Sequence, residues 1–292
     1  MNFPLSFPIL QVPLSKSVLG RIGHCVNKCQ FFSGGLRVTR NVKIDITIVA
    51  GRRPELLRAT LESFSYRAFS HHDVQDVFVN IDPIFGDQAD ADACINLVRD
   101  YFPSPVIFTP HEPGFGAAVK RLWSSTTSGF VMHLEDDWLA FDDIDARIEA
   151  CFQAERVKQV SFHTANQNWD IKKRGHHHRR RRYATFFGVK LPLPSTYPKF
   201  TTSPSIIEGD FARVSADLMN PAFDPEKQFY SGVNAALERA VAGCDNYIFS
   251  PNSKPMILDT GRTWRQERGI SKNVRNATSI WEKTTSDQVV GR

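Results

Sequence analysis

GFVMHLEDDW, residues 129–138, passes without a turn from an apolar run into three consecutive carboxylates. The apolar run at residues 130–134 is typical of a buried strand. In open parallel α/β sheets, ligands bind outside the carboxyl ends of the strands, so we expect Glu135, Asp136 and Asp137 at the mouth of a site. Adjacent acids repel one another unless a cation offsets their charge, and a hard divalent cation held together with substrate phosphates would do so. An acidic turn that caps the next helix explains the triplet equally well, so the rest of the chain has to separate the two interpretations.

Three strand and helix pairs precede the acidic stretch. We expect strands at residues 44–50, 77–81 and 106–108, because each is a short apolar or β-branched run bounded by turn residues. Helices should follow them: Pro54 stands where proline favours the first helical turn, and residues 94–101 carry apolar side chains at helical spacing. Strands that alternate with helices of this length predict an α/β fold with a mainly parallel, Rossmann-like sheet flanked by helices and right-handed crossovers.

After the acidic stretch the regular pattern continues and then breaks. A helix is expected from Asp142 onward and a strand at residues 157–163. Residues 164–203 have no helical or strand period, so we predict an irregular segment there. Beyond it, the pattern predicts a strand, a turn and a helix over residues 205–219, a helix over residues 225–242, and short apolar runs at 247–249 and 256–258. The polar stretch at 259–272 fits a loop that faces the site and a plain C-terminal loop equally well.

The length and composition are those of a globular protein with a sizeable core. The chain has 292 residues, of which 41% are hydrophobic and 23% charged, which fits one large domain or two small ones. A net charge of +5 suits anionic partners but does not choose among nucleotides, nucleic acid and membrane surfaces. The five scattered cysteines form no disulfide or zinc framework, so a reducing, cytoplasmic location is expected.

Two basic segments stand outside the α/β pattern. Residues 1–42 contain no Asp or Glu and are interrupted by prolines, so we expect no transmembrane span there. A targeting or membrane-surface segment and a poorly ordered extension both fit them. Residues 172–182, KKRGHHHRRRR, cannot contribute to a core. They fit a solvated loop, a contact with an anionic acceptor or membrane surface, or, least well, nucleic-acid binding, because no aromatic platform accompanies the charge. Three consecutive histidines in an irregular loop set up no defined metal geometry, so we do not count them as ligands.

Candidate site residues fall at the end of each expected strand. The carboxyl ends of parallel strands share one edge of a sheet, so these residues should gather around one ligand. Glycines let the backbone approach a ligand, and acids suit ribose hydroxyls and a diphosphate-bound metal. The chain has neither GxxxxGK[ST] nor a GxGxxG directly after a strand, so kinase-like and dinucleotide-binding interpretations have no motif. The candidates are Arg52 and Arg53 after the first strand, Asp82 after the second, Gly114 and Gly116 after the third, and the acid triplet after the fourth.

The order TIVAGRRPELLRATLESF, VFVNIDP, EPGFGAAVKRLW, GFVMHLEDDW resembles the nucleotide-sugar-binding half of GT-A-fold glycosyltransferases, most of all glycosyltransferase family 2, over residues 43–162. The resemblance implies one GT-A catalytic domain at residues 43–292, with a nucleotide-sugar half at 43–163 and an acceptor-side half at 164–292. It implies inverting transfer of a sugar from a UDP- or GDP-sugar to a hydroxyl of a glycan or lipid-linked acceptor, as in polysaccharide biosynthesis, with no specific nucleic-acid partner. A peripheral contact with the inner face of the membrane stays open.

The resemblance also assigns roles to individual residues. The triplet Glu135-Asp136-Asp137 corresponds to the DxD-type motif of the fold. It implies that Mn²⁺ or Mg²⁺ bridges the donor diphosphate, with Asp137 as the best ligand and Asp136 as a second ligand or, like Glu135, a ribose contact. The metal would stabilise the negative charge that develops on the leaving diphosphate. Arg52 and Arg53 would line the base pocket, although surface charges in a turn fit them equally well. The other nucleotide-sugar contacts implied are Asp82, Gly114, Gly116, Lys120, Arg262 and Trp264, with Arg265 beside the last two.

An inverting transfer also needs a general base that deprotonates the acceptor hydroxyl. In the family this carboxylate comes from the segment after the irregular stretch, where this chain has Glu208-Gly209-Asp210. The resemblance favours Asp210 slightly over Glu208. Either residue could instead N-cap the helix that follows.

Two other classes of protein remain as alternatives. A sugar-1-phosphate nucleotidyltransferase uses a similar sheet but would carry a Gly-rich basic loop after the first strand, where this chain has only GRRP. A non-enzymatic sugar- or nucleic-acid-binding protein would bind through Arg179 to Arg182, and its acids would be structural. The basic segment also lies where the acceptor site of the family should be built, so the acceptor class stays open.

Overall fold

The computed structural model describes residues 42–166, 169–230 and 232–283. All of them fall within one of the two units into which the chain divides, residues 39–292. The extension expected at residues 1–42 therefore lies, apart from Val42, outside the described residues.

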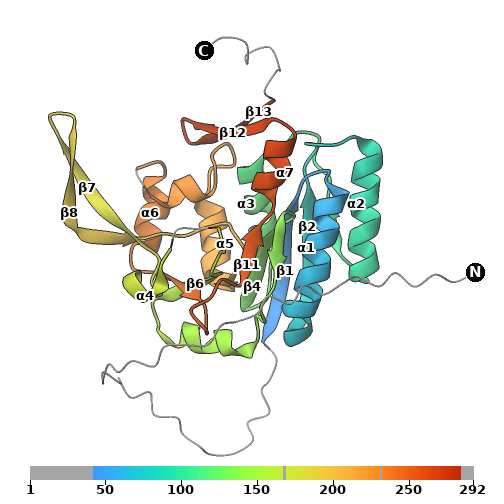
Figure 1. Ribbon diagram of the computed structural model, residues 1–292, viewed down its shortest axis with the longest axis horizontal. Helices are drawn as coiled ribbons and strands as arrows, with labels where there is room; N and C mark the ends of the chain where they lie inside the picture. The colour runs from blue at the N-terminus through green and yellow to red at the C-terminus, as the bar shows by residue number, and fades with distance from the viewer. Residues whose placement is uncertain (1–41, 167–168, 231, 284–292) are drawn as a thin grey trace, which may run out of the picture. The chain divides into compact units, whose positions relative to one another are not determined.

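The centre of this unit is a seven-stranded sheet with the order β10-β6-β9-β4-β1-β2-β3 (Figure 1). Its strands pair in parallel except β9, which runs antiparallel to both β4 and β6. The mainly parallel sheet expected from the sequence is thus confirmed. The strands are β1 Lys43–Ala50, β2 Asp73–Ile81, β3 Val106–Phe108, β4 Phe130–Glu135, β6 Val157–Phe162, β9 Ser205–Glu208 and β10 Asp245–Phe249.

Strand order reverses beside β1. The chain moves from β1 to β2 and β3 in one direction, and then α3 returns it to β4 on the other side of β1. In open α/β sheets the crevice at such a switch point is where ligands bind. The carboxyl ends of β1 and β4, which carry the GRRP turn and the acid triplet, therefore flank the predicted ligand position.

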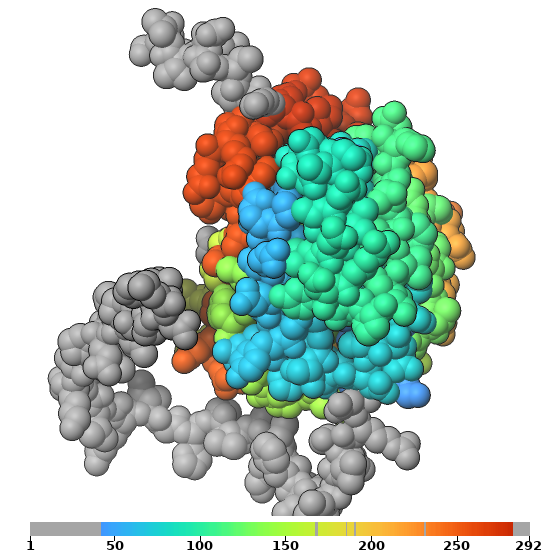
Figure 2. All heavy atoms as spheres, turned by 90° about the vertical axis from the view of Figure 1, so that its right-hand side faces the viewer, coloured from blue at the N-terminus to red at the C-terminus, as the bar shows by residue number. Residues whose placement is uncertain are grey.

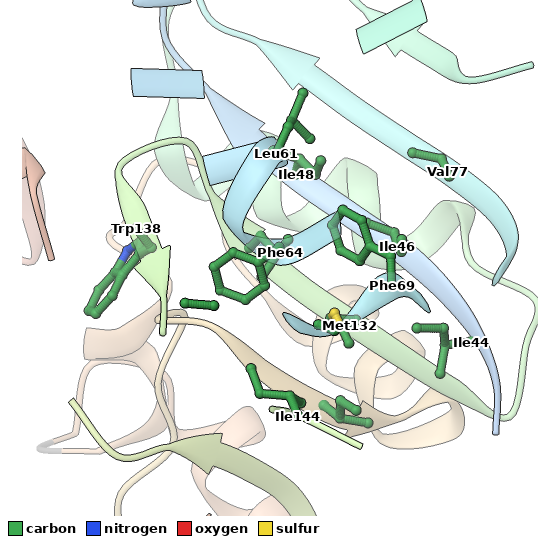
Figure 3. Close-up of a cluster of buried hydrophobic side chains, with 14 of the residues drawn as sticks. Ile44, Ile46, Ile48, Leu61, Phe64, Phe69, Val77, Met132, Trp138 and Ile144 are labelled. Atoms are coloured by element: carbon green, nitrogen blue, oxygen red, sulfur yellow. The ribbon is translucent and has the colours of Figure 1, made fainter. Parts of the chain in front are cut away.

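Both faces of the sheet are covered by helices, as a buried parallel sheet requires. Ile44, Ile46 and Ile48 of β1 point to one face and are fully buried there with Leu61 and Phe64 of α1 (Figure 3). Truncating a buried side chain such as Phe64 to alanine typically costs about 3–5 kcal/mol. Helices α1 Pro54–Arg67 and α2 Gln88–Tyr101 belong to this face, and α3 Phe115–Ser125, α5 Gly209–Leu218 and α6 Ala235–Val241 belong to the opposite one.

A second, smaller pairing brings the C-terminal part of the chain to the acid triplet. Strand β5 Trp138–Ala140 follows the triplet directly and pairs antiparallel with β11 Ile257–Asp259. Helix α7 Gly261–Glu267 and the hairpin β12 Ile270–Arg275 and β13 Thr278–Lys283 come next. Figure 2 shows this C-terminal segment adjoining the surface that the first βα units form.

Three expected segments differ from the prediction. The helix expected after Asp142 is the 3-10 helix η2 Ala146–Gln153. The helix expected at residues 225–242 is interrupted between η3 Glu226–Phe229 and α6, where Gly232 adopts a positive φ of 78°. Within the stretch predicted to be irregular, α4 Ile171–Arg174 is followed by a hairpin of β7 Arg179–Phe186 and β8 Val189–Pro198. Consecutive arginines give no alternation of apolar and polar residues, which is why the pattern missed β7.

Across residues 42–166, 169–230 and 232–283, no helix is both long and apolar enough to cross a bilayer.

Candidate functional site

A cavity of about 520 Å³ lies at the carboxyl edge of the sheet. The ends of β1, β2 and β4 form its floor together with the first turn of α3. Residues of the second half of the chain form the rest of its wall: 202–203, 221–224, Glu226 and several positions between 259 and 281. The structure therefore brings the predicted strand-end residues, apart from Arg52, to one hollow at the switch point.

The acid triplet is held in place by Arg53. Oδ2 of Asp136 accepts hydrogen bonds from the backbone N–H of Gly51 at 2.9 Å and from Nε of Arg53 at 3.2 Å. Nη2 of Arg53 also pairs with Oδ1 of Asp136 and lies 3.2 Å from Oδ2 of Asp137. The Arg53 and Asp136 side chains are only 6% and 2% exposed. Arg53 is thus an interior residue that joins the ends of β1 and β4, and not a surface charge in a turn.

The pKa values of both partners of this buried ion pair are shifted. Burial raises the pKa of Asp136 to about 6, although Arg53 pulls it in the opposite direction. Burial alone would lower the pKa of Arg53, but the attraction of Asp136 and Asp137 outweighs it and the pKa is raised. Because both Asp136 oxygens are already engaged, this residue suits a structural role better than the ligand role that the resemblance implied.

Aromatic rings enclose the other side of the Arg53 guanidinium. Its central carbon lies 4.9 Å from the ring centre of Phe85 and 5.2 Å from that of Trp264, within the range of cation–π attraction. Nε1 of Trp264 donates to Glu55 of α1 at 2.7 Å. Trp264 is itself only 7% exposed, so it acts as a wall behind Arg53 and fastens α7 to α1.

Asp137 is fixed by its backbone and its side chain. Its carbonyl accepts from the backbone N–H of Thr260 at 2.9 Å and from the Thr260 hydroxyl at 2.8 Å. Oδ2 lies 3.2 Å from Arg53 and 3.6 Å from Nη1 of Arg265. A Cβ atom at position 261 would lie only 1.9 Å from this oxygen, so Gly261 is required by the close approach of the carboxylate.

Glu135 differs from its two neighbours. Within the described part of the chain its carboxylate has neither a hydrogen bond nor a salt bridge, although it lines the cavity. Burial raises its pKa well above the ordinary range, Asp137 raises it further, and Lys272 opposes the shift. Glu226 and Asp259 add smaller repulsions. Glu135 is therefore the acid of the triplet that needs a positive partner.

The residues at the cavity fit a divalent cation shared with a ligand better than an all-protein cage. Among the residues described, no group of three or more His, Cys, Asp or Glu is placed to hold a metal. Mg²⁺ is usually held by one or two carboxylates together with substrate phosphates, and Glu135 and Asp137 supply that number. A cation between them would also remove the repulsion that raises the pKa of Glu135.

The second and third strand ends also meet at the cavity. Oδ2 of Asp82 accepts from the backbone N–H of Gly114 at 3.1 Å, and Oδ1 accepts from Nδ2 of Asn80 at 2.7 Å. Burial raises the pKa of Asp82. A Cβ at Gly116 would lie 2.1 Å from the carbonyl oxygen of Phe223, so this glycine lets α3 approach the opposite wall.

Several predicted site residues are not at the cavity. Nζ of Lys120 donates to the carbonyls of Ala216, Asp217 and Met219 at 2.6 to 3.0 Å, so it caps the end of α5. Arg52 is absent from the lining of the cavity, and its backbone N–H donates to Ile84 at 2.9 Å. Neither Lys120 nor Arg52 therefore lines the cavity in which the other strand-end residues meet.

The two candidate bases lie at the other edge of the sheet. Strand β9 is antiparallel to β4 and pairs Glu208 with Phe130, the first residue of β4. Five residues of strand, about 17 Å, separate that position from Glu135. Glu208 pairs with Lys158 at 2.5 Å, and Asp210 pairs with Arg213 at 2.7 Å with its side chain 86% exposed. The structure therefore gives no geometric support to Glu208 or Asp210 as the general base. The prediction did not foresee that β9 runs antiparallel to β4, which places its carboxyl end at the opposite edge of the sheet.

The cavity also contains residues that the sequence analysis did not single out. Asp224 and Glu226 follow α5 in the chain, Asp259 ends β11, and Lys272 and Trp281 come from the C-terminal hairpin. Arg262, Arg265 and Lys272 line the cavity, as the site-facing segment at residues 259–272 suggested. Within PAFDPEK, residues 221–227, Glu226 falls inside the helix expected at 225–242 and Asp224 directly precedes it, so the pattern gives no sign of a site there.

No family model matches the chain, and no curated protein matches its sequence. Solved structures with a similar fold include the mannosyltransferase PcManGT from Pyrobaculum calidifontis, in complex with GDP-Man and Mn²⁺, at 11% identity and a TM-score of 0.52 over 77% of this chain. They also include S. aureus TarS 1-349 in complex with UDP-GlcNAc, at 14% identity and a TM-score of 0.48 over 74% of this chain, and the same TarS segment without a named ligand, at 13% identity and a TM-score of 0.45 over 75%. This chain covers 60%, 58% and 60% of those three chains. The chain thus has the GT-A fold, which confirms the fold class expected from the sequence.

Proposed function

We propose that this protein transfers a sugar from a nucleoside-diphosphate sugar to an acceptor hydroxyl, with residues 43–292 as a single GT-A catalytic domain. The observation that carries the proposal is the Glu135 carboxylate, which has a raised pKa and no hydrogen-bond or salt-bridge partner among the described residues. It lies next to Asp137 in a cavity at the switch point of the sheet. The similar mannosyltransferase structure with GDP-Man and Mn²⁺ bound supports a nucleoside-diphosphate sugar as the donor, and UDP- and GDP-sugars are the candidates that we propose.

The donor would lie across the carboxyl ends of β1, β2 and β4. Asp82 would accept hydrogen bonds from ribose hydroxyls or base N–H groups, beside the backbone of Gly114. Glu135 and Asp137 would hold Mn²⁺ or Mg²⁺ on the diphosphate. When bound, such a cation stabilises the negative charge that develops on the leaving diphosphate. Arg265 and Lys272 line the same cavity and would add positive charge there.

We propose Glu226 as the general base of an inverting transfer, in place of Asp210 and Glu208. It lines the cavity from the acceptor-side half. Oε1 accepts hydrogen bonds from the Thr201 hydroxyl and from the backbone N–H of Thr202 at 3.0 Å. That fixes the carboxylate, and Oε2 has no hydrogen bond within the described residues. Asp259 is the other carboxylate in the cavity that we weigh as a base. Burial and the charge of Asp137 raise its pKa. It pairs with Trp138, however, and so lies on the Asp137 side of the cavity, where the cation would bind.

Calorimetry with UDP and GDP, each with and without Mn²⁺, tests the donor site. We expect one of the two nucleotides to bind, the binding to need the metal, and Glu135→Ala and Asp137→Ala each to abolish it. Asp100→Ala, an exposed carboxylate on α2, is the matched control and should bind as the wild type does. Metal-independent binding, or no binding of either nucleotide, would contradict the proposal.

A donor-hydrolysis screen then tests the chemistry. Many enzymes of this kind should transfer slowly to water, so incubation with a panel of nucleotide sugars should release the nucleoside diphosphate from one of them. Glu226→Gln should lose sugar transfer while keeping nucleotide binding, and Asp259→Asn should keep measurable transfer. The opposite pattern would move the base to Asp259.

A further inference from the structure

The hairpin formed by residues 179–198, here called the arm, projects from the central sheet (Figure 1). Its outer end is apolar and open to solvent. Phe186 is 65% exposed, Phe187 93%, Val189 59% and Leu191 50%. Exposed apolar residues that gather in one place, unlike scattered ones, mark a contact site.

The apolar residues share one end and largely one face of the arm. Phe186 pairs with Val189 and Ala184 pairs with Leu191, and directly paired residues point to the same side of a sheet. Phe187 stands in the turn with a positive φ of 48°, followed by Gly188 at 78°. Asn or Gly is usual at the first of these turn positions. The Phe187 ring packs edge-on against the ring of Phe186, with ring centres 4.7 Å apart. Its side chain is otherwise almost fully exposed, so it contributes little more than this contact to the fold of the arm.

The inner end of the arm is cationic. Arg180, Arg181 and Arg182 are exposed, and none has a salt bridge within the described part of the chain. Residues 171–207 contain nine Lys and Arg and no Asp or Glu. Phe186 stands four positions after Arg182, which is about 13 Å along an extended strand. An apolar segment that lies in the membrane interface is buried by roughly 5–10 Å. The spacing therefore lets the tip of the arm enter the interface while the arginines remain at the level of the lipid phosphates.

We propose that the arm docks the protein on an anionic bilayer surface, with Phe186, Phe187, Val189 and Leu191 in the interface and Arg180 to Arg182 against the lipid phosphates. A second copy of the chain would bring the same positive charge to the contact and would be repelled. An anionic membrane offers both an apolar layer and opposite charge. The proposal does not depend on the proposed sugar transfer, because the arm does not line the cavity at the sheet edge.

Sedimentation of the full-length protein with vesicles tests the proposal. Vesicles of 30% phosphatidylglycerol in phosphatidylcholine should bind the protein, more strongly at low salt, and pure phosphatidylcholine should bind it far less. Losing one arginine from an anionic surface weakens binding about fivefold, so the triple variant Arg180→Gln, Arg181→Gln, Arg182→Gln should bind about 100-fold more weakly. The double variant Phe186→Ser, Phe187→Ser should lose about tenfold per side chain.

Matched controls separate the arm from the rest of the chain. The triple variant Arg58→Gln, Arg99→Gln, Arg147→Gln changes the net charge equally at exposed positions of α1, α2 and η2, outside the arm, and should bind like the wild type. Tyr66→Ser removes another exposed aromatic residue and should also have no effect. Circular dichroism should show all variants folded.

Four results would overturn the proposal. They are no binding to anionic vesicles, undiminished binding by both arm variants, equal losses in the control variants, and a wild-type dimer that the Phe186→Ser, Phe187→Ser variant dissociates without any vesicle binding. The last result would assign the tip to a second copy of the chain. The third would mean that only overall charge matters.

Discussion

Arg53→Met is the substitution that most directly tests the electrostatic arrangement of the site. Methionine keeps most of the side-chain volume against Phe85 and Trp264 but removes the guanidinium. Among the described residues, the Asp136 side chain, 2% exposed, would keep only the backbone N–H of Gly51 as a partner, and the Asp137 side chain would keep only Arg265. A buried ion pair that loses one partner destabilises a protein by about 3–5 kcal/mol, because the remaining charge is uncompensated. For a domain of this size that corresponds to a Tm about 6–20 °C lower.

The loss should depend on pH in a defined direction. Burial already raises the pKa of Asp136 to about 6 in the presence of Arg53, and without Arg53 it should rise further. The folded variant then binds a proton that the unfolded chain, with an ordinary carboxyl pKa near 3.9, does not bind at the same pH. Its stability therefore falls as the pH rises through the folded pKa and recovers as the pH falls. Between pH 7.5 and 5.5, one such proton restores up to about 2.7 kcal/mol.

Urea unfolding at pH 7.5 and 5.5 measures both effects. In the double variant Arg53→Met, Asp136→Asn the buried charge is gone, and most of the stability should return. Arg67→Met, which breaks an exposed pair with Asp143, is the control and should leave the unfolding midpoint nearly unchanged. A loss for Arg53→Met below about 1 kcal/mol, or an equal loss with and without Asp136→Asn, would refute the reasoning.

Four further predictions follow from single contacts. Gly261→Ala places a methyl group against Oδ2 of Asp137, so metal-dependent nucleotide binding should fall at least tenfold in calorimetry while circular dichroism stays unchanged. The Mn²⁺ affinity of the wild type should weaken as the pH drops below the raised pKa of Glu135, because a cation binds the carboxylate form. The Glu135→Gln variant should bind Mn²⁺ weakly at every pH. If the variant keeps the pH profile of the wild type, another group titrates. Lys120→Met should cost about 2 kcal/mol in urea unfolding, from lost charged hydrogen bonds, and leave nucleotide affinity intact. Asp210→Asn should retain sugar transfer, since the residue is exposed at the far edge of the sheet; a dead Asp210→Asn enzyme that still binds nucleotide would restore it as the base.

The first half of the fold could be predicted because its elements have strong local signals. β1 and α1 are an unbroken β-branched run and an apolar stripe opened by Pro54, and both appear at the expected residues. The second half depends on contacts that a local pattern does not contain. β9 reads as an ordinary short apolar strand, but only its insertion between β4 and β6 fixes its antiparallel direction.

The candidate site follows the same division. Asp82, Gly114 and the triplet could be placed at one edge because each follows a strand of a parallel sheet. Their individual roles could not be derived, because side-chain pairing decides them. Arg53 pairs with Asp136, and within residues 42–166, 169–230 and 232–283 Glu135 has no such partner. Glu226 enters the cavity from a segment whose periodicity gave no sign of a site.

The pairing of β5 with β11 has a consequence for the order in which the protein matures. Asp137 gains the Thr260 hydrogen bonds, and Arg265 as a neighbour, from a part of the chain more than 120 residues later. During synthesis, the acid triplet therefore leaves the ribosome long before the residues that shape it, and long-range contacts of this kind also form late in folding. A nascent chain halted before residue 257 should contain the strands of the first half of the sheet but lack the residues that complete the cavity. Nucleotide binding would then begin only after the late segment has been made and has paired, and a nucleotide added during translation would mark the moment at which the site is complete.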